Sequence, residues 1–210
     1  MKSIVIIGFG GFGREVDWLA RECGRTVRGF LDDNATPGKK GNYTILGGLD
    51  TWSAYPDTEL VVAIGNPRIR RKIVEKLVSQ GVTDFATLIH PSVNMDETVD
   101  VGKGTMICAG SIATVDIAIG DHVILNLNVT VGHDDEIHDF VTVAPMVALS
   151  GNVTLEEGVE VGTGAAIRQG ITMACGSMLG MGGILTKDSE ANTIYVGSPA
   201  KPLKHLPEFI

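Results

Sequence analysis

Aliphatic residues recur at every sixth position through the second half of the chain, from Ile89 to Leu185, without a slip in register. Fourteen of these 17 positions hold Ile, Leu or Val, although these three types make up only 56 of the 210 residues. Neither an α-helix, with a period of 3.6, nor a strand, with a period of two, sustains such a repeat. A stacked solenoid does, because each hexad forms one flat face and one corner of a coil. The repeat therefore predicts a β-helix of about five coils.

Glycine often follows the aliphatic position directly, as at Gly102, Gly120, Gly132, Gly162 and Gly180. We predict that these glycines relieve the corners of the coil, where φ can be positive. The residue four positions after the aliphatic one is usually small or β-branched and is expected to pack beside it. An ordinary β-sandwich is disfavoured, because the strands of such folds vary in length and spacing.

The first half of the chain alternates between strand and helix patterns. The expected elements are strands at 3–7, 27–31 and 60–64 and a helix at 14–23. A second helix is expected to have Ile69, Ile73, Leu77 and Val78 on one face. Residues 84–89 are expected to lead out of this part of the chain. This β-α-β order predicts a small parallel sheet covered by helices. The expected division is a Rossmann-like domain over 1–86, a β-helix over 87–188 and a tail over 189–210.

Charge and composition exclude several classes of protein. The formal net charge of −8 argues against nucleic acid or an anionic membrane surface as the main partner. No apolar run approaches the roughly 20 residues of a membrane span, and nothing resembles a signal peptide. The three cysteines are odd in number and lie in no metal-ligand spacing, so they are expected to be free thiols. These features predict a cytoplasmic protein.

A glycine-rich loop follows the first strand and opens the first helix. Gly8, Gly10 and Gly13 have the spacing of the dinucleotide fingerprint, and Asp32 lies 19 residues after the last of them. An NAD-dependent dehydrogenase is disfavoured, because four short strands make too small a sheet and the rest of the chain consists of hexads. Two alternatives remain: a purely structural turn, or a site where backbone N–H groups at a helix N-terminus bind an anion or a sugar hydroxyl.

Five motifs occur in an order that resembles a known family: 8–13 (GFGGFG), 30–33 (FLDD), 63–66 (AIGN), 132–134 (GHD) and 196–201 (VGSPAK). On the hexad background this set resembles the hexapeptide-repeat acyltransferases. The similar branch contains sialic acid O-acetyltransferases and UDP-amino-sugar or GDP-perosamine N-acetyltransferases. The resemblance implies a left-handed parallel β-helix with 18 residues per coil. It also implies a homotrimer that binds acetyl-CoA between adjacent helices.

The resemblance also implies positions for both substrates. The residues expected to line a nucleotide-sugar pocket are Gly10, Gly11, Phe12, Asp32, Asp33 and Gly65. Many relatives have His in place of Phe12, so the contact with the sugar or nucleotide must differ. The residues expected to contact acetyl-CoA are Thr142, Thr163 and Met181, with Thr142 replacing a His of many relatives. Lys201 is either a phosphate contact or a solvated lysine of the tail.

His133 is the candidate catalytic base. Acyl transfer to an amine or hydroxyl needs a base that titrates near neutral pH, and histidine is the usual choice. The adjacent Asp134 is expected to orient the ring and keep it basic. Gly151 lies 18 residues further, in register with His133 in the next coil, and its backbone N–H is the expected donor to the oxyanion. Asp135, where the family commonly has Cys, either turns outward or acts on His133 as a second carboxylate.

The sequence therefore predicts an acetyl-CoA-dependent N-acetyltransferase that acts on a nucleotide-linked amino-sugar by direct attack on the thioester. One alternative is a sugar O-acetyltransferase that uses the same base. Another is a non-catalytic β-helix that binds a ligand or organises an assembly. A carbonic-anhydrase-like β-helix is disfavoured, because the five histidines form no evident zinc-binding set. No metal, nucleic acid or membrane span is expected.

Overall fold

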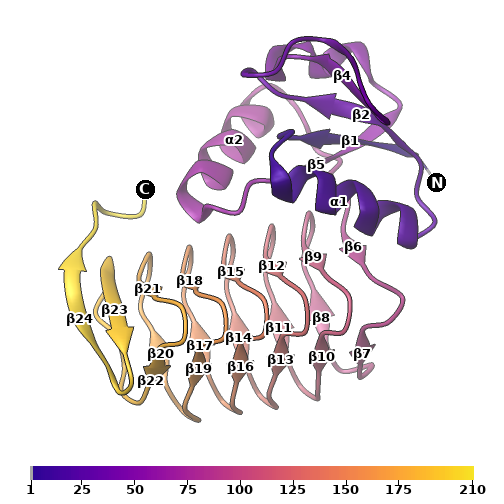
Figure 1. Ribbon diagram of the computed structural model, residues 1–210. Coiled ribbons are helices and arrows are strands. Elements are labelled where there is room, and N and C mark those ends of the chain that lie inside the picture. Colours follow the sequence, from indigo (N-terminus) through magenta and orange to yellow (C-terminus); the bar gives the residue numbers. More distant parts are fainter. Residues whose placement is uncertain (1) are drawn as a thin grey trace.

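A computed structural model describes residues 2–210 and shows an N-terminal α/β domain resting on one side of a long β-helix (Figure 1). The N-terminal sheet has the strand order β3-β4-β2-β1-β5. Its strands are β1 (Ser3–Ile7), β2 (Val27–Leu31), β3 (Gly38–Lys40), β4 (Tyr43–Gly47) and β5 (Thr58–Val62). Its helices are α1 (Gly11–Glu22), the 3-10 helix η1 (Leu49–Ala54) and α2 (Pro67–Ser79).

Strands β1, β2, β4 and β5 run parallel, and only β3 is antiparallel to its neighbour β4. The sequence predicts β1 and β2 with their observed bounds but misses β3 and β4. The segment 84–89 does not add a strand to this sheet. It makes a single bridge, from Phe85 to Leu60, and then enters the β-helix.

Helix α2 buries only half of the face predicted for it. Leu77 is buried and Ile73 is half-buried against the core, but Ile69 and Val78 are each 53% exposed. Val74 and the whole side chain of Arg70 are buried instead. This part of the prediction was wrong because an arginine within a helix is normally assigned to the solvent face. Here the guanidinium group faces the β-helix and finds carbonyl acceptors there.

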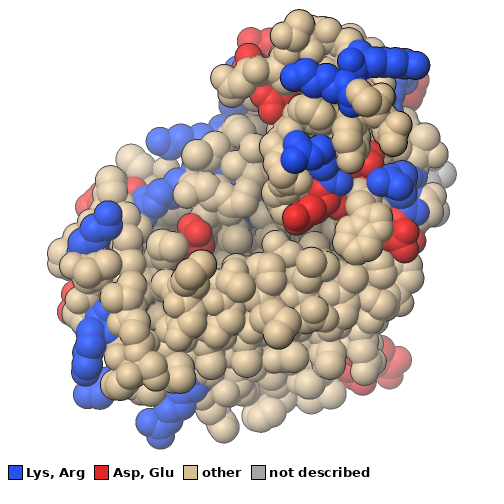
Figure 2. All heavy atoms as spheres, viewed as in Figure 1, with Lys and Arg blue, Asp and Glu red and all other residues tan. Residues whose placement is uncertain are grey.

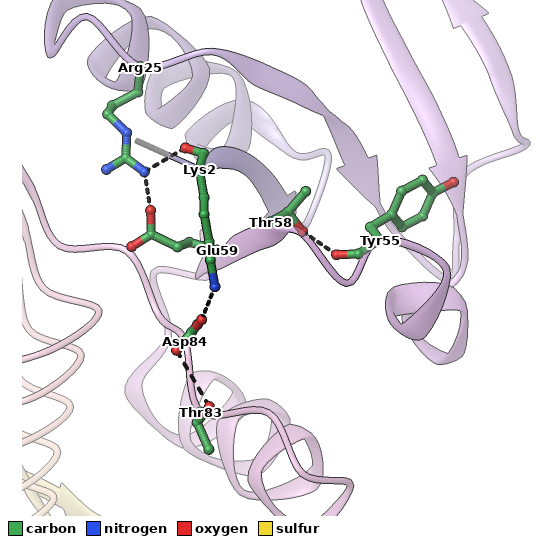
Figure 3. Close-up of polar contacts among 7 residues, drawn as sticks. All are labelled: Lys2, Arg25, Tyr55, Thr58, Glu59, Thr83 and Asp84. Carbon is green, nitrogen blue, oxygen red and sulfur yellow. Dashed lines mark hydrogen bonds and ion pairs between the residues drawn. The ribbon is translucent and has the colours of Figure 1, made fainter.

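Ion pairs join the segments at the amino-terminal edge of the sheet (Figure 3). Lys2 pairs with Asp84, and Arg25 pairs with Glu59 and donates to the Lys2 carbonyl at 3.0 Å. The opposite edge, at the carboxyl ends of β1, β2 and β5, carries the glycine-rich loop and the Gly65 turn. In open α/β sheets this is the edge where ligands bind.

Seventeen two-residue strands, β6 to β22, form the β-helix, and each strand from β6 to β19 pairs in parallel with the strand 18 residues further along. Face 1 consists of β6 (Leu88–Ile89), β9 (Met106–Ile107), β12 (Ile124–Leu125), β15 (Thr142–Val143), β18 (Glu160–Val161) and β21 (Met178–Leu179). Face 2 consists of β7 (Asn94–Met95), β10 (Ile112–Ala113), β13 (Thr130–Val131), β16 (Ala148–Leu149), β19 (Ala166–Ile167) and β22 (Ile184–Leu185). Face 3 consists of β8 (Asp100–Val101), β11 (Ala118–Ile119), β14 (Glu136–Ile137), β17 (Thr154–Leu155) and β20 (Thr172–Met173).

The three faces give each coil a triangular section, and the predicted fold, a left-handed β-helix behind a Rossmann-like domain, is confirmed. The second residue of each short strand is the hexad aliphatic and points into the core. Strands β23 (Thr193–Gly197) and β24 (Ala200–His205) form a hairpin that extends face 1 beyond β21. The predicted tail therefore contributes to the sheet.

The corner glycines differ from the prediction. Positive φ occurs two residues after the predicted position, for example at Gly104 and Gly164, and at Asp134 with φ of 60°. Gly132, like the other glycines directly after the aliphatic residue, is needed for close approach between coils. A Cβ at Gly132 would collide with the backbone of Gly151 in the next coil.

The N-terminal domain packs on face 1. Met106 and Ile124 of face 1 belong to the same buried cluster as Ile4 and Phe30 of the domain. Because face 1 is covered, the edge between faces 2 and 3 is the edge of the triangle furthest from the N-terminal domain.

Candidate active site

His133 and Asp134 lie in the turn between β13 and β14, at the edge between faces 2 and 3. Asp134 adopts the left-handed conformation, which aspartate tolerates better than most residues. The His133 Nδ1 and Asp134 Oδ2 atoms are 2.6 Å apart, and both side chains are more than half exposed. The carboxylate therefore holds Nδ1 and leaves Nε2 as the free nitrogen of the ring, the arrangement of an oriented base.

Gly151 lies beneath the free nitrogen, in the next coil. A Cβ on Gly151 would overlap Nε2 of His133, so the ring can occupy this position only over a glycine. The neighbouring Asn152 N–H donates to the His133 carbonyl at 2.7 Å and fixes the two turns against each other. Within residues 2–210 the Gly151 N–H has no acceptor. The structure thus brings the predicted base and the predicted oxyanion donor together.

Asp135 turns inward and is fully buried. Its Oδ1 accepts the Val153 N–H at 2.7 Å, and its Oδ2 accepts the Gly132 N–H at 3.2 Å. Burial raises the pKa of the Asp135 carboxyl to about 7, against the pull of these two donors. Of the two alternatives that the sequence leaves open, the outward orientation is excluded.

His122, by contrast, is a structural histidine. It is buried at the junction of the two domains, with its ring stacked on Phe140 at 5.3 Å and edge-on to Phe85 at 4.7 Å. Burial lowers the pKa of His122 to about 4, so the ring is neutral near pH 7.

The glycine-rich loop has open space on its outer side. A Cβ at Gly13 would overlap the Gly8 carbonyl, so this glycine lets α1 pack against β1. At Gly10, Gly11 and Gly65 an added Cβ would meet nothing within 4 Å, so a ligand can approach the backbone at all three. These glycines lie at the carboxyl edge of the sheet, as the sequence predicts.

The two predicted aspartates of this pocket are engaged with the backbone. Asp32 accepts the Phe9 N–H at 2.7 Å and the Asn34 N–H at 2.8 Å, which joins the loops after β1 and β2. Asp33 accepts the Leu49 N–H at 2.7 Å, at the start of η1. Their contact with a nucleotide sugar stays a prediction, and so does that of Phe12, whose ring is half-buried.

Two cationic side chains that the sequence did not indicate lie beside this loop. The Arg14 guanidinium carbon and the Lys40 Nζ each lie 5.8 Å from the centre of the Phe9 ring. Lys40 belongs to β3, a strand that no hydrophobic period indicates, so the sequence alone did not predict that Lys40 lies beside this loop. The pair supplies positive charge next to the N-terminus of α1, where phosphate groups bind favourably.

Thr142 lies under the N-terminal domain. Its hydroxyl donates to the Gly65 carbonyl at 2.7 Å, and its side chain is almost entirely buried. Arg70 donates to the same carbonyl at 3.0 Å. In the single chain Thr142 therefore holds the Gly65 turn on face 1, and its contact with an acetyl group stays a prediction.

Thr163 and Met181 stack at the edge between faces 1 and 2, where the Gly182 N–H donates to the Thr163 carbonyl at 2.9 Å. Met181 is 79% exposed, which is unusual for an apolar side chain. This edge differs from the edge of His133, and both edges border face 2. Within one chain the predicted acetyl-CoA position and the predicted base are therefore apart.

A cavity of about 390 Å³ lies along face 3, but the predicted site residues do not line it. Five of its nine lining residues are acidic or histidine: Asp100, Glu136, His138, Asp139 and Glu157. This lining is unsuited to the phosphates of a nucleotide or of CoA. Across the described chain, no three His, Cys, Asp or Glu side chains gather as metal ligands. None of the helices in residues 2–210 combines the length and apolarity needed to cross a membrane.

Comparison with known proteins gives relatives over the whole chain. Residues 3–77 match the family model described as the PglD N-terminal domain. The chain is 32% identical over 223 residues to GDP-perosamine N-acetyltransferase of Escherichia coli O157:H7, with 100% of both proteins covered. It is 33% identical over 114 residues, 52% of each protein, to UDP-N-acetylbacillosamine N-acetyltransferase of Bacillus subtilis.

Two solved structures have the same architecture from end to end. A Caulobacter crescentus enzyme in complex with CoA and GDP-perosamine is 30% identical, with a TM-score of 0.90 and coverage of 97% of this chain and 98% of that one. The acetyltransferase domain of PglB from Neisseria gonorrhoeae, in complex with acetyl coenzyme A, is 33% identical, with a TM-score of 0.88 and coverage of 96% and 99%. The chain therefore belongs to the family of hexapeptide-repeat N-acetyltransferases that includes GDP-perosamine N-acetyltransferase.

Proposed function

We propose that the protein transfers the acetyl group of acetyl-CoA to the amino group of a nucleotide-linked amino-sugar, with His133 as the base. The observation that carries the proposal is the turn in which Asp134 holds Nδ1 of His133 and leaves Nε2 free above Gly151. The relatives support the substrate class, since they are named for acetyl transfer to such sugars. The motifs of the sequence lead to the same reaction.

The reaction proceeds by direct attack. The sugar nitrogen forms a bond to the thioester carbonyl carbon while Nε2 of His133 takes a proton from that nitrogen. The negative charge on the carbonyl oxygen is stabilised by the Gly151 N–H, which is free to donate. The carbon–sulfur bond then breaks, and CoA leaves as its thiolate.

A covalent acetyl-enzyme intermediate is not required. Burial raises the pKa of Cys108 to about 12, so its thiol does not ionise near neutral pH. Burial also raises the pKa of Cys175. The Cys23 thiol donates a hydrogen bond to the Ile89 carbonyl at 3.2 Å, and burial raises the pKa of this thiol as well.

The acceptor is proposed to bind at the carboxyl edge of the N-terminal sheet. The open backbone at Gly10, Gly11 and Gly65 gives room for it, and the N-terminus of α1 favours a diphosphate. Arg14 and Lys40 add positive charge at the same place. This local charge opposes the net charge of −8 of the whole chain.

A homotrimer is proposed to complete the site. The N-terminal domain covers face 1, so the acceptor pocket of one chain lies on the opposite side of its coil from its own His133. Face 2 lies between the edge of His133 and the edge of Met181, and none of its outward residues is charged: Asn94, Ile112, Thr130, Ala148, Ala166 and Ile184. Figure 2 shows such an uncharged surface on the β-helix below the N-terminal domain. Packing of face 2 against another copy of the chain would bring the His133 edge of one subunit close to the Met181 edge of the other.

Release of the CoA thiol tests the function. The protein is incubated with acetyl-CoA and a panel of GDP-, UDP- and dTDP-linked 4-amino-sugars, with free sialic acid as the hydroxyl acceptor. We expect turnover with at least one nucleotide amino-sugar and an amide in the product by mass spectrometry. Turnover of sialic acid alone would replace the proposal with O-acetyl transfer. No turnover with any acceptor would leave the non-catalytic alternative.

A further inference from the structure

Two hydroxyl side chains inside the β-helix, those of Thr105 and Ser111, follow one pattern. Thr105 accepts the N–H of Val123, 18 residues further, at 3.0 Å, and its hydroxyl donates to the Gly120 carbonyl at 2.8 Å. Ser111 does the same one hexad later, with the Val129 N–H and the Asn126 carbonyl. Each inward hydroxyl therefore joins its own coil to the next one.

Asp135 occupies the same hexad position but makes a different second bond. Its Oδ1 accepts the N–H of Val153, 18 residues further, as the hydroxyls do. Its Oδ2 accepts the Gly132 N–H, within the turn that carries His133. A hydroxyl cannot make both bonds, because it has one oxygen and a shorter reach.

The two amides that Asp135 binds belong to the two halves of the acetyl-transfer site. Gly132 directly precedes His133, and Val153 lies two residues after Gly151. We propose that Asp135 is a positioning residue that holds, from inside the coil, the turn of the base against the turn of the oxyanion donor. This inference rests on the proposed function and assigns Asp135 a role in that same site.

The carboxyl also places a titratable charge beneath His133. The ionisable groups around Asp135 lie in its own coil and in the coil before: His133, Asp134, Glu136 and Asp116. The turn at 150–153 in the next coil contributes none. His133 lowers the pKa of Asp135 and Asp134 raises it, but burial has the largest effect and brings that pKa to about 7. Asp135 therefore gains or loses its charge near neutral pH, directly behind the turn of the base.

Two substitutions separate positioning from mere stability. Asp135→Ser keeps the bond to Val153, as Ser111 does for its own coil, and loses the bond to Gly132. Asp135→Asn keeps the size of the side chain and retains at most one of the two acceptor bonds, so it serves where the serine variant fails to fold. Thr105→Val is the matched control, because it removes an equivalent inter-coil bond far from the site.

We expect kcat for thiol release to fall about 10- to 100-fold in both Asp135 variants, with KM for acetyl-CoA within twofold of the wild type. Thr105→Val should keep kcat within threefold. The His133 ring signals in NMR spectra of histidine-labelled protein should shift in both Asp135 variants and stay in place in Thr105→Val, because only the Asp135 variants lose the bond to the Gly132 N–H.

Wild-type kcat and unmoved His133 ring signals in the Asp135 variants would overturn the proposal. An equal loss of kcat in Thr105→Val would overturn it too, because any inter-coil bond would then have the same effect. The NMR measurement needs no turnover. A wild type without acetyltransferase activity would therefore refute the proposed function, while the ring signals still test whether Asp135 holds the turn of His133.

Discussion

Replacing Arg70 with methionine should separate the stability of the N-terminal domain from that of the β-helix. The buried guanidinium donates five hydrogen bonds, to the carbonyls of Ile64, Gly65, His122, Phe140 and Val141, at 2.6–3.1 Å. Three of these carbonyls belong to the β-helix. Methionine has a similar length and no donor, so Arg70→Met leaves the carbonyls of Ile64, His122 and Phe140 without a partner. The Gly65 carbonyl still accepts the Thr142 hydroxyl, and the Val141 carbonyl still accepts the Ile124 N–H.

The expected loss follows from two opposing contributions. At about 2 kcal/mol for each bond to a charged donor, five bonds contribute roughly 10 kcal/mol. Burial lowers the pKa of Arg70 from 12.5 to about 9, which corresponds to a desolvation cost of roughly 5 kcal/mol. The difference between these two contributions is about 5 kcal/mol. Because several bonds to one group do not add fully, the expected loss in the free energy of unfolding is about 3–5 kcal/mol.

Tryptophan fluorescence and circular dichroism report on different parts of this chain. Both tryptophans, Trp18 and Trp52, lie in the N-terminal domain, whereas most of the strand signal comes from the β-helix. In urea we expect the two transitions to coincide in the wild type, and the fluorescence transition to come first in Arg70→Met. The matched control is Arg71→Met, which removes pairs with Glu75 and Glu157 near the surface and should cost about 1 kcal/mol or less. Equal midpoints for the two variants would refute the role assigned to Arg70.

Three further results are expected. Gly151→Ala places a methyl group against Nε2 of His133 and should lower kcat about 100-fold, whereas Ser150→Ala should not; equal kcat values would refute the stacking of base and donor. In the wild type, burial raises the folded-state pKa of Asp135 from 3.8 to about 7, so the stabilising contribution of this carboxyl is complete below pH 4 and is lost as the pH rises through 7. Asp135→Asn removes this dependence on pH. The stability of the variant relative to the wild type should therefore increase by about 4 kcal/mol between pH 4 and pH 8 in urea titrations, and a constant difference would show that Asp135 is not desolvated. Co-assembly of His133→Ala with Gly10→Trp should restore about a quarter of wild-type activity if base and acceptor pocket come from different subunits, and none if one chain supplies both.

The hexad repeat predicted most of the β-helix because one physical constraint recurs in every coil. Each hexad must bury one aliphatic side chain, so the interior register could be read without coordinates, and residues such as Val131 and Leu149 lie where it places them. The same register placed Gly151 next to His133, in the following coil. The N-terminal strands β1 and β2 were also predicted, since they are short apolar runs with clear ends.

The remaining features depend on contacts between distant segments. Strand β3 is a polar three-residue segment that is a strand only because it pairs with β4, so no local pattern indicates it. Arg70 is buried because carbonyls of the β-helix lie opposite it, which no helical period shows. Asp135 stands at an interior position of the hexad, but only the amides of Gly132 and Val153 show why a carboxyl group is held there.

The central claim, that His133 is the base of an acetyl transfer, is tested most directly by the pH dependence of kcat/KM in the wild type and in His133→Ala. With acetyl-CoA and the accepted nucleotide amino-sugar, we expect the wild-type value to rise with pH through the neutral range. In His133→Ala, kcat should fall by roughly 10²–10⁴ and this rise should disappear, while KM for acetyl-CoA changes little. Asp134→Asn should lose less, because the ring keeps its place above Gly151. A His133→Ala enzyme with near wild-type kcat and the same rise with pH would contradict the account.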